Sequence, residues 1–323
     1  MDIELLGRFV AVVELGSLNK AAAKLNLSQP TLSRSISLLE ERFSAELIRR
    51  SSRGIVPTSF GEALFRRAKL VNSELRKAET ELGALRNLSI GEVNVGLPSG
   101  LSLMKTVLPI VTPPLVSGTS RLVINYITGN HPELLSQVRL GDLDFAITDI
   151  IDGMAGEDLV QEPLFIGRSA LFVRRKHPLL ALRKITIDDI NRYAWVTMPS
   201  SAVLEERLRK LGSGLGKPFS KGVIRSDSSL LVRSILMDSD MVGLVTLDAV
   251  FQEKTRGILV EIDLDKGRQS NYLPEPQSIG IVYRRDAGLS PAGETLVSKI
   301  KQRCAQMGLI TSTKQKRSKQ NAA

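Results

Sequence analysis

The sequence predicts three parts in chain order: a small, mainly helical domain, one long helix, and an α/β domain of two subdomains. Three observations support this prediction. Residues 16–40 hold two short helical patterns joined by a tight turn. Apolar residues then repeat at heptad spacing as far as residue 85. After residue 91, strand patterns alternate with helix patterns, which is typical of a mostly parallel, doubly wound sheet.

The first domain begins with three expected helices. Residues 2–15 place apolar side chains at helical spacing. Ser17 stands where the N-cap of a second helix, residues 18–25, should lie. Asn26 and Leu27 then form the turn to a third helix.

The third helix has one apolar face and one face of unusual composition. Ser28 caps it, and Pro30 lies in its first turn, where a missing N–H costs nothing. The apolar face consists of Leu32, Ile36, Leu39 and Phe43. The other face carries no acid before Glu40 and consists of Gln29, Thr31, Ser33, Arg34, Ser35 and Ser37.

A face of hydroxyls, one amide and one guanidinium suits the base edges and phosphate oxygens of DNA. An ordinary surface helix is the alternative, but such helices usually mix both charge signs. The sequence therefore predicts a DNA-contacting helix. Its candidate contacts are Ser28, Gln29, Pro30, Thr31, Ser33 and Arg34.

Residues 46–58 are expected to form two short strands that meet at a turn around Gly54. Three arginines accompany this turn: Arg49, Arg50 and Arg53. The whole first domain carries a pattern at fixed offsets: Phe9, Glu14, Gly16-Ser17, Ala21-Ala22, Leu25, Ser28-Gln29-Pro30, Leu32-Ser33, Ile36 and Leu39-Glu40. This pattern resembles the DNA-binding end of a LysR-type transcriptional regulator.

The resemblance implies an all-α winged helix-turn-helix DNA-binding domain. In such a domain the wing flanks the recognition helix, and Arg50 or Arg53 enters the adjacent minor groove, with plain phosphate contact as the alternative role. The chain departs from the family at two places. It has Phe43-Ser44 where the family has Leu-Gly, and Pro57-Thr58-Ser59-Phe60-Gly61 where the family has Leu-Thr-x-x-Gly.

A long helix is expected to follow, because Ser59 and Glu62 have capping-box spacing and an apolar stripe runs behind them. The stripe consists of Leu64, Ala68, Val71, Leu75, Ala78, Leu82 and Leu85. Near-strict heptads between two domains favour a dimerising linker, although one helix packed on its own domain would show a similar stripe. The candidate dimer contacts are Leu64, Val71, Leu75, Leu82 and Leu85. Two such linkers would hold two DNA-binding domains at a spacing that matches a two-fold site.

The remainder reads as alternating strands and helices. Strands are expected at residues 91–97, 121–127 and 144–148, with helices between them. Residues 141–147 read Gly-Asp-Leu-Asp-Phe-Ala-Ile and resemble the Gly-x-Leu-Asp-Leu-Ala-Ile stretch of LysR effector domains. That likeness implies a periplasmic-binding-protein-like effector domain. The expected divisions are a DNA-binding domain at 1–58, a linker at 59–88, an effector domain at 91–308 (subdomain I at about 91–163 and 267–308, subdomain II at about 164–266), and a disordered basic tail at 309–323.

Small molecules in such sheets bind beyond the carboxyl ends of the strands. Hydroxyls and helix amino termini at those ends favour an oxyanion, such as the carboxylate of a small organic acid. The alternative is that the same side chains only cap helices. The candidate effector contacts are Ser99, Gly100, Ser102, Thr128, Asn130, Thr148, Ser200, Ser201 and Ser228.

The composition is that of an ordinary soluble chain, with a net charge of +10 that points to an anionic partner. Residues 1–90 hold 14 Lys or Arg against 10 Asp or Glu, and residues 311–323 hold four bases and no acid. One cysteine, Cys304, excludes an internal disulfide and a cysteine-based metal cluster. The start lacks the features of a signal peptide and no stretch has the length of a membrane span, so a cytoplasmic protein without a membrane partner is expected.

The sequence offers no catalytic, metal or cofactor site. Its two histidines, His131 and His177, each precede a proline and lack metal-ligand spacing. Residues 212–216 superficially resemble a nucleotide loop. They follow a helical pattern instead of a strand, so a flexible connector is expected there.

Together these patterns predict a sequence-specific transcription regulator that binds double-stranded DNA and responds to a small-molecule effector bound in a cleft between the two α/β subdomains. The family likeness implies a dimer of dimers that bends DNA, and an activator would also contact RNA polymerase. Two alternatives are a two-lobe solute-binding protein and a ligand-independent architectural DNA-binding protein. The missing signal peptide disfavours the first, and the nearly neutral middle of the chain disfavours the second.

Overall fold

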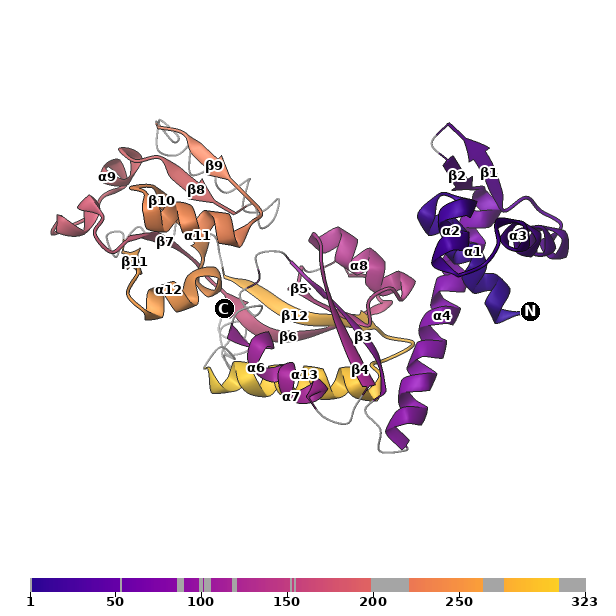
Figure 1. The fold of residues 1–323 in the computed structure, drawn as a ribbon. Helices are drawn as coiled ribbons and strands as arrows, with labels where there is room; N and C mark the ends of the chain where they lie inside the picture. Colours follow the sequence, from indigo (N-terminus) through magenta and orange to yellow (C-terminus); the bar gives the residue numbers. More distant parts are fainter. Residues whose placement is uncertain are drawn as a thin grey trace, which may run out of the picture.

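The computed structural model describes residues 2–52, 54–85, 90–98, 101, 106–117, 121–151, 153, 155–198, 221–263 and 276–307. It has three parts in chain order (Figure 1): an amino-terminal domain, the long helix α4 (Ser59–Leu85), and a body that contains two five-stranded sheets. The positions of Arg53, Ser99, Gly100, Ser102, Ser200, Ser201, the 212–216 segment and the basic tail lie outside the described residues.

Three helices form the amino-terminal domain, and a side-chain oxygen caps each of them. Asp2, Ser17 and Ser28 accept hydrogen bonds from the first turns of α1 (Ile3–Leu15), α2 (Leu18–Lys24) and α3 (Gln29–Phe43). The core between them includes Leu6, Phe9, Val12, Leu32, Ile36 and Leu39. Phe43 is exposed, contrary to its expected place in the apolar stripe, because α3 ends there and its last turn runs past the core.

The wing is a two-stranded antiparallel ribbon of β1 (Ile48–Ser51) and β2 (Gly54–Pro57). Pro57 pairs with Ile48 at the open end of the ribbon, where its missing N–H does not interrupt the ladder. The carboxylate of Glu40 accepts a hydrogen bond from the Leu47 amide at 2.8 Å. The end of α3 is thereby tied to the start of the wing.

Ser44 ends α3 in the left-handed conformation, with φ of 49°. That conformation costs an ordinary L-residue about 1 kcal/mol, whereas glycine adopts it freely. The glycine expected at this position from the family that the sequence resembles therefore has a local explanation. In this chain the helix still ends in the same way, because the amide of Ala45 bonds to the carbonyl of Glu40.

Helix α4 presents a polar stripe to the body of its own chain. Ser73, Lys77 and Thr80 follow each other at helical spacing and are all buried. The Lys77 ammonium donates to the carbonyl of Gly288 at 3.0 Å. Thr80 lies so close to Gly91 that a Cβ at residue 91 would approach the threonine Oγ1 within 2.3 Å. Helix α4 therefore packs closely against the body and is hydrogen-bonded to it.

Subdomain I contains the sheet β4-β3-β5-β12-β6. Strands β3 (Ile90–Leu97), β4 (Arg121–Thr128) and β5 (Phe145–Asp149) are parallel. Strands β12 (Gln277–Arg284) and β6 (Leu159–Gly167) are antiparallel additions. Strand β6 passes residue 163 and stays in this sheet as its edge.

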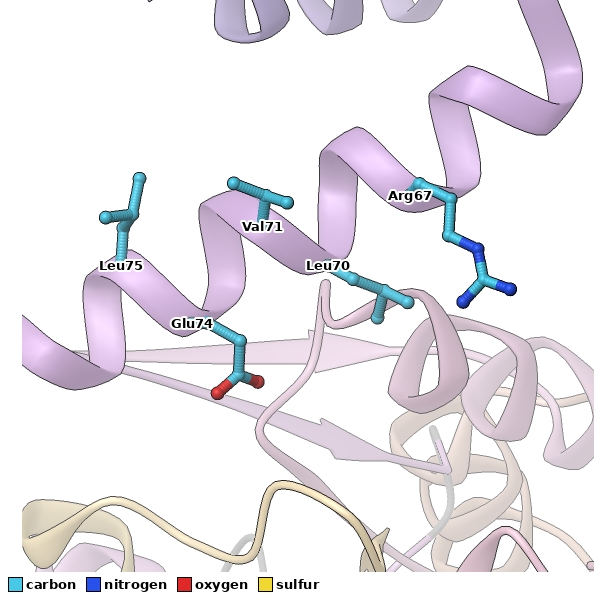
Figure 2. A pocket seen from close by; sticks show the side chains of 5 residues that line it. All are labelled: Arg67, Leu70, Val71, Glu74 and Leu75. Atoms are coloured by element: carbon cyan, nitrogen blue, oxygen red, sulfur yellow. The ribbon is translucent and has the colours of Figure 1, made fainter. Parts of the chain in front are cut away.

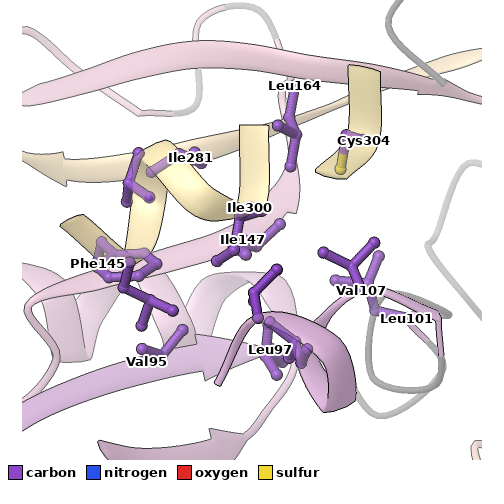
Figure 3. Packing of buried hydrophobic residues seen from close by; sticks show 14 of the residues in the cluster. Val95, Leu97, Leu101, Val107, Phe145, Ile147, Leu164, Ile281, Ile300 and Cys304 are labelled. Atoms are coloured by element: carbon purple, nitrogen blue, oxygen red, sulfur yellow. The ribbon is translucent and has the colours of Figure 1, made fainter. Parts of the chain in front are cut away.

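Helices cover both faces of that sheet. One face carries α13 (Pro291–Gln306) with the short helices α6 (Leu108–Val111) and α7 (Pro113–Val116), over the apolar core of Figure 3. The other face carries α8 (His131–Leu140), which packs through Leu134, Leu135 and Val138.

Subdomain II contains the sheet β11-β7-β10-β8-β9. Its strands are β7 (Ser169–Arg174), β8 (Trp195–Thr197), β9 (Val223–Arg225), β10 (Val242–Thr246) and β11 (Leu259–Ile262). The helical segments are η1 (Pro178–Ala181), α9 (Ile187–Asn191), α11 (Ser229–Asp238), η2 (Leu247–Val250) and α12 (Phe251–Thr255). Here β7 runs antiparallel to both of its neighbours, β10 and β11.

Both sheets are mixed, which corrects the expectation of a mostly parallel body. Each sheet joins two parallel pairs to two antiparallel pairs. The chain leaves subdomain I through β6 and returns to it as β12. Because these two strands run in opposite directions side by side, the crossing itself creates the antiparallel part of that sheet.

Candidate nucleic-acid interface and effector site

The amino end of α3 is capped and largely open to solvent. Ser28 Oγ accepts a hydrogen bond from the Thr31 amide at 3.2 Å and lies 2.7 Å from Thr31 Oγ1. Pro30, Thr31 and Arg34 are exposed, whereas Gln29 and Ser33 are partly buried. The predicted DNA contacts before the wing therefore lie at the N-cap and in the first two turns of α3. The exposed Arg50 lies on β1 of the wing, which follows α3 in the chain.

Ser35 does not belong to that surface, which corrects its placement on the polar face. Its side chain is 3% exposed and accepts a hydrogen bond from the Arg8 guanidinium at 2.8 Å. It also donates to the carbonyl of Thr31. The serine was expected outside because it is polar, but a guanidinium from α1 supplies a partner inside.

The carboxyl ends of the three parallel strands in subdomain I meet at one place. The amide of Gly129, just after β4, donates to the carbonyl of Leu97 at the end of β3. His131, the first residue of α8, lies 3.1 Å from Thr148 of β5 (Nδ1 to Oγ1). Since β3 separates β4 from β5, this is the point where the order of the strands reverses.

The described effector candidates differ in their surroundings. Thr148 is fully buried beside His131, and Asn130 forms a capping box with Glu133 at the start of α8. Thr128 is exposed at the end of β4. Ser228 lies in subdomain II, where its hydroxyl caps α11 and is exposed. Asn130 thus directly precedes His131 at the start of α8 and Thr148 contacts the His131 ring, while Ser228 lies in subdomain II at the start of α11.

His131 is the residue that sequence reasoning missed at this place. Burial lowers the pKa of its imidazole, so the ring is neutral near pH 7. Its Nε2 atom is buried and has no hydrogen-bond partner among the described residues. The sequence did not predict that His131 contacts Thr148, because only the crossover through α8 brings the two residues together.

The apolar stripe of α4 is divided between two environments. Leu64 and Val71 pack against the core of the amino-terminal domain, which fits the alternative of a helix packed on its own domain. Leu75, Leu82 and Leu85 are 37%, 60% and 82% exposed. A shallow hollow of about 450 Å³ lies along the helix. Figure 2 shows Val71 and Leu75 projecting from the same side of α4. The hollow is lined by Arg67, Leu70, Val71, Glu74 and Leu75.

The single cysteine, Cys304, lies inside the protein. Cys304 is buried in the core of subdomain I, where desolvation raises the pKa of its thiol to about 11. Within the described ranges, His, Cys, Asp and Glu side chains nowhere gather in a group of three that suits a metal ion. No helix in those ranges has both the length and the apolar content that a bilayer crossing requires.

Two family models match this chain, one for each end. Residues 3–62 match the model described as "Bacterial regulatory helix-turn-helix protein, lysR family". Residues 86–305 match the model described as "LysR substrate binding domain".

Individual proteins of this kind are similar over most of the chain. The HTH-type transcriptional regulator GbpR of Rhizobium radiobacter is 29% identical over 245 residues, which cover 75% of this chain and 80% of that protein. The full-length CbnR complexed with its target DNA has a TM-score of 0.60 at 16% identity, over 94% of this chain and 100% of that one. The full-length LysG of Corynebacterium glutamicum with bound effector Arg has a TM-score of 0.61 at 16% identity, over 95% and 99% of the two chains.

Proposed function

The chain belongs to the LysR family of transcription regulators, and we propose that a small organic acid bound in subdomain I controls how its dimers bind a two-fold DNA site. The observation that carries the effector part is the meeting of β3, β4 and β5 beside His131 and Thr148. A neutral imidazole, a threonine and a capped helix start are groups that bind carboxylate oxygens. LysG, a protein of similar fold, has a bound effector Arg, and this supports a ligand with a carboxylate.

For DNA, we propose that α3 enters the major groove and the wing follows the neighbouring backbone. The open, capped surface of Pro30, Thr31 and Arg34 supports this role, and CbnR is a protein of similar fold that is complexed with DNA. Gln29 and Arg34 carry the groups that recognise base edges. The proposed contacts are completed by Ser28, Ser33, Arg50 and Arg53.

The assembly and setting follow from the same proposal. Two α4 helices would join two chains, and two such dimers would form a tetramer that bends the operator. An activator of this kind would contact RNA polymerase beside its operator. A regulator that acts on chromosomal DNA works in the cytoplasm.

The DNA contacts are tested with duplexes selected from genomic fragments by the full-length protein. We expect Gln29→Ala and Arg34→Ala each to lower affinity for the selected duplex by about 1–3 kcal/mol, because each removes a side chain that reaches a base. Fluorescence anisotropy at fixed salt measures this change. Arg256→Ala, which removes an exposed arginine from subdomain II, is the control and should leave the affinity unchanged. Full affinity in both α3 variants would show that another surface reads the DNA.

The effector site is tested by a thermal-shift screen of small carboxylic acids and amino acids. A true effector raises the unfolding temperature, because it binds the folded state only. The amide derivative of the same acid should not raise the unfolding temperature. We expect Thr148→Val, and alanine at Ser99 or Ser102, to abolish the shift while leaving duplex binding intact. A shift that survives all three substitutions would place the ligand elsewhere.

A further inference from the structure

One ammonium group joins the amino-terminal domain to subdomain I. Lys69 of α4 is nearly buried, and its Nζ lies 2.9 Å from Glu14 Oε1 of α1. The same atom lies 2.5 Å from Asp142 Oδ1, in the turn that follows α8. The Phe65 ring lies below it, with the centroid 5.2 Å away. Lys69 therefore pairs at once with a carboxylate of the amino-terminal domain and a carboxylate of the body.

The carboxyl end of α8 is fixed to α4 by further contacts. The Arg76 guanidinium donates to the carbonyl of Gly141 at 2.8 Å. Gly141 has a φ of +74°, and a Cβ there would lie 2.7 Å from the Cβ of Ser73. Backbone thus lies directly against the side of α4, so a displacement of this end of α8 must also move α4 or break these contacts.

The amino end of α8 lies at the proposed effector site, where His131 meets Thr148. Helix α8 has 10 residues and is therefore about 15 Å long. Its Leu134, Leu135 and Val138 are buried against the sheet of subdomain I, beside α4 (Figure 1). A helix packed in this way moves as a unit, so its two ends respond together.

We infer that α8 and Lys69 transmit the state of the effector site to the DNA-binding domain, a regulation that rests on the proposed function. A shift of α8 moves Asp142 relative to Glu14, and one ammonium then holds only one of the two carboxylates. The link through Lys69 between the amino-terminal domain and the body is complete when both pairs are made and is weakened when one breaks. Coupling of this kind is reciprocal, so DNA binding must change the affinity for the effector by the same factor as the effector changes the affinity for DNA, and α8, as the connecting helix, responds to DNA as well.

This reciprocity allows a test with DNA as the only ligand. Hydrogen exchange of the α8 peptide, residues 131–143, is measured in the full-length protein with and without the selected duplex. In the wild type we expect the duplex to change exchange in this peptide by about fivefold. In Lys69→Met the change should disappear, while duplex affinity stays within about fivefold, because Glu14 and Asp142 remain partly exposed and solvated.

Two further variants distinguish the loss of the Lys69 ion pairs from a general loss of structure. Lys69→Arg keeps a cation that reaches both carboxylates and should restore the exchange change. Lys254→Met removes an ion pair to Glu261 inside subdomain II and should behave as wild type. If the duplex still changes α8 exchange in Lys69→Met, or leaves it unchanged in the wild type, the inferred route is wrong. If the wild type binds no duplex, the proposed function itself fails.

Discussion

Replacing Gly61 by alanine is expected to unfold the amino-terminal domain and to abolish DNA binding. Gly61 lies in the first turn of α4, where a Cβ would stand 1.9 Å from the carbonyl oxygen of Leu47 and 3.1 Å from Pro57. The obstacle is backbone, which cannot rotate away as a side chain does. We expect a loss of about 3 kcal/mol or more, which is a large part of the stability of so small a domain.

The damage would spread because the same carbonyl belongs to a hydrogen-bonded junction. The Thr58 amide donates to Leu47 O at 3.0 Å, and the Thr58 hydroxyl donates to Glu46 O at 2.6 Å. The Gly61 amide in turn donates to the Thr58 hydroxyl. Leu47 itself is buried in the core of the domain. Displacing its carbonyl therefore separates α4 from the wing and disturbs the core together.

Thermal unfolding followed by circular dichroism, together with anisotropy on the selected duplex, measures the effect of Gly61→Ala. Gly7→Ala is the matched control, since Gly7 also lies in a helix but a Cβ there meets nothing within 4 Å. That variant should gain up to about 1 kcal/mol from helix propensity. Equal stability of the two variants would refute the steric argument.

The junction also shows why part of this domain could be predicted from sequence and part could not. Caps and apolar spacing are local, so Ser17, Ser28 and the heptads of α4 were sufficient to place three helices with nearly correct ends. The resemblance to the family pointed to Thr58 and Gly61 as a pair without saying what they do. The close contact of Gly61 with Leu47 requires the folded wing, and no local pattern encodes it.

In the body, the sequence did not predict the features that depend on contacts between residues far apart in the chain. Strand β6 was not among the expected strands, and Pro163 lies inside it. It is an edge strand, and its register against β12 shifts beside Pro163, so the missing N–H breaks no necessary bond. At the candidate effector site, Thr148 was expected from its place at a strand end. His131 was not, because its partner lies on a strand that only the crossover brings near.

The second large expected effect concerns α4, whose two stripes have the reverse of the usual arrangement. Ser73, Lys77 and Thr80 are buried, whereas Leu75 and Leu82 are exposed. Positions two residues apart lie on nearly opposite sides of a helix. Helices normally bury the apolar side. An isolated chain thus exposes leucines along α4 while its polar side faces the body, and a second copy of this helix is the partner that would cover them.

If α4 joins two chains as proposed, substituting both Leu75 and Leu82 by glutamate is expected to convert the proposed dimer to a monomer. The dimer would lose four buried leucines at about 1.5 kcal/mol each, or about four orders of magnitude in its dissociation constant, before charge repulsion is counted. Light scattering coupled to gel filtration measures the mass. Duplex affinity should fall with it, because one DNA-binding domain then contacts only half of a two-fold site.

The control for this pair is Leu182→Glu, which places the same charge on a similarly exposed leucine of subdomain II and should leave the mass unchanged. The double variant should stay folded, because neither Leu75 nor Leu82 belongs to a buried core of its own chain, and circular dichroism checks this directly. A double variant that keeps the wild-type mass would show that the chains join through another surface. In that case the exposed leucines of α4 would need a partner other than a second copy.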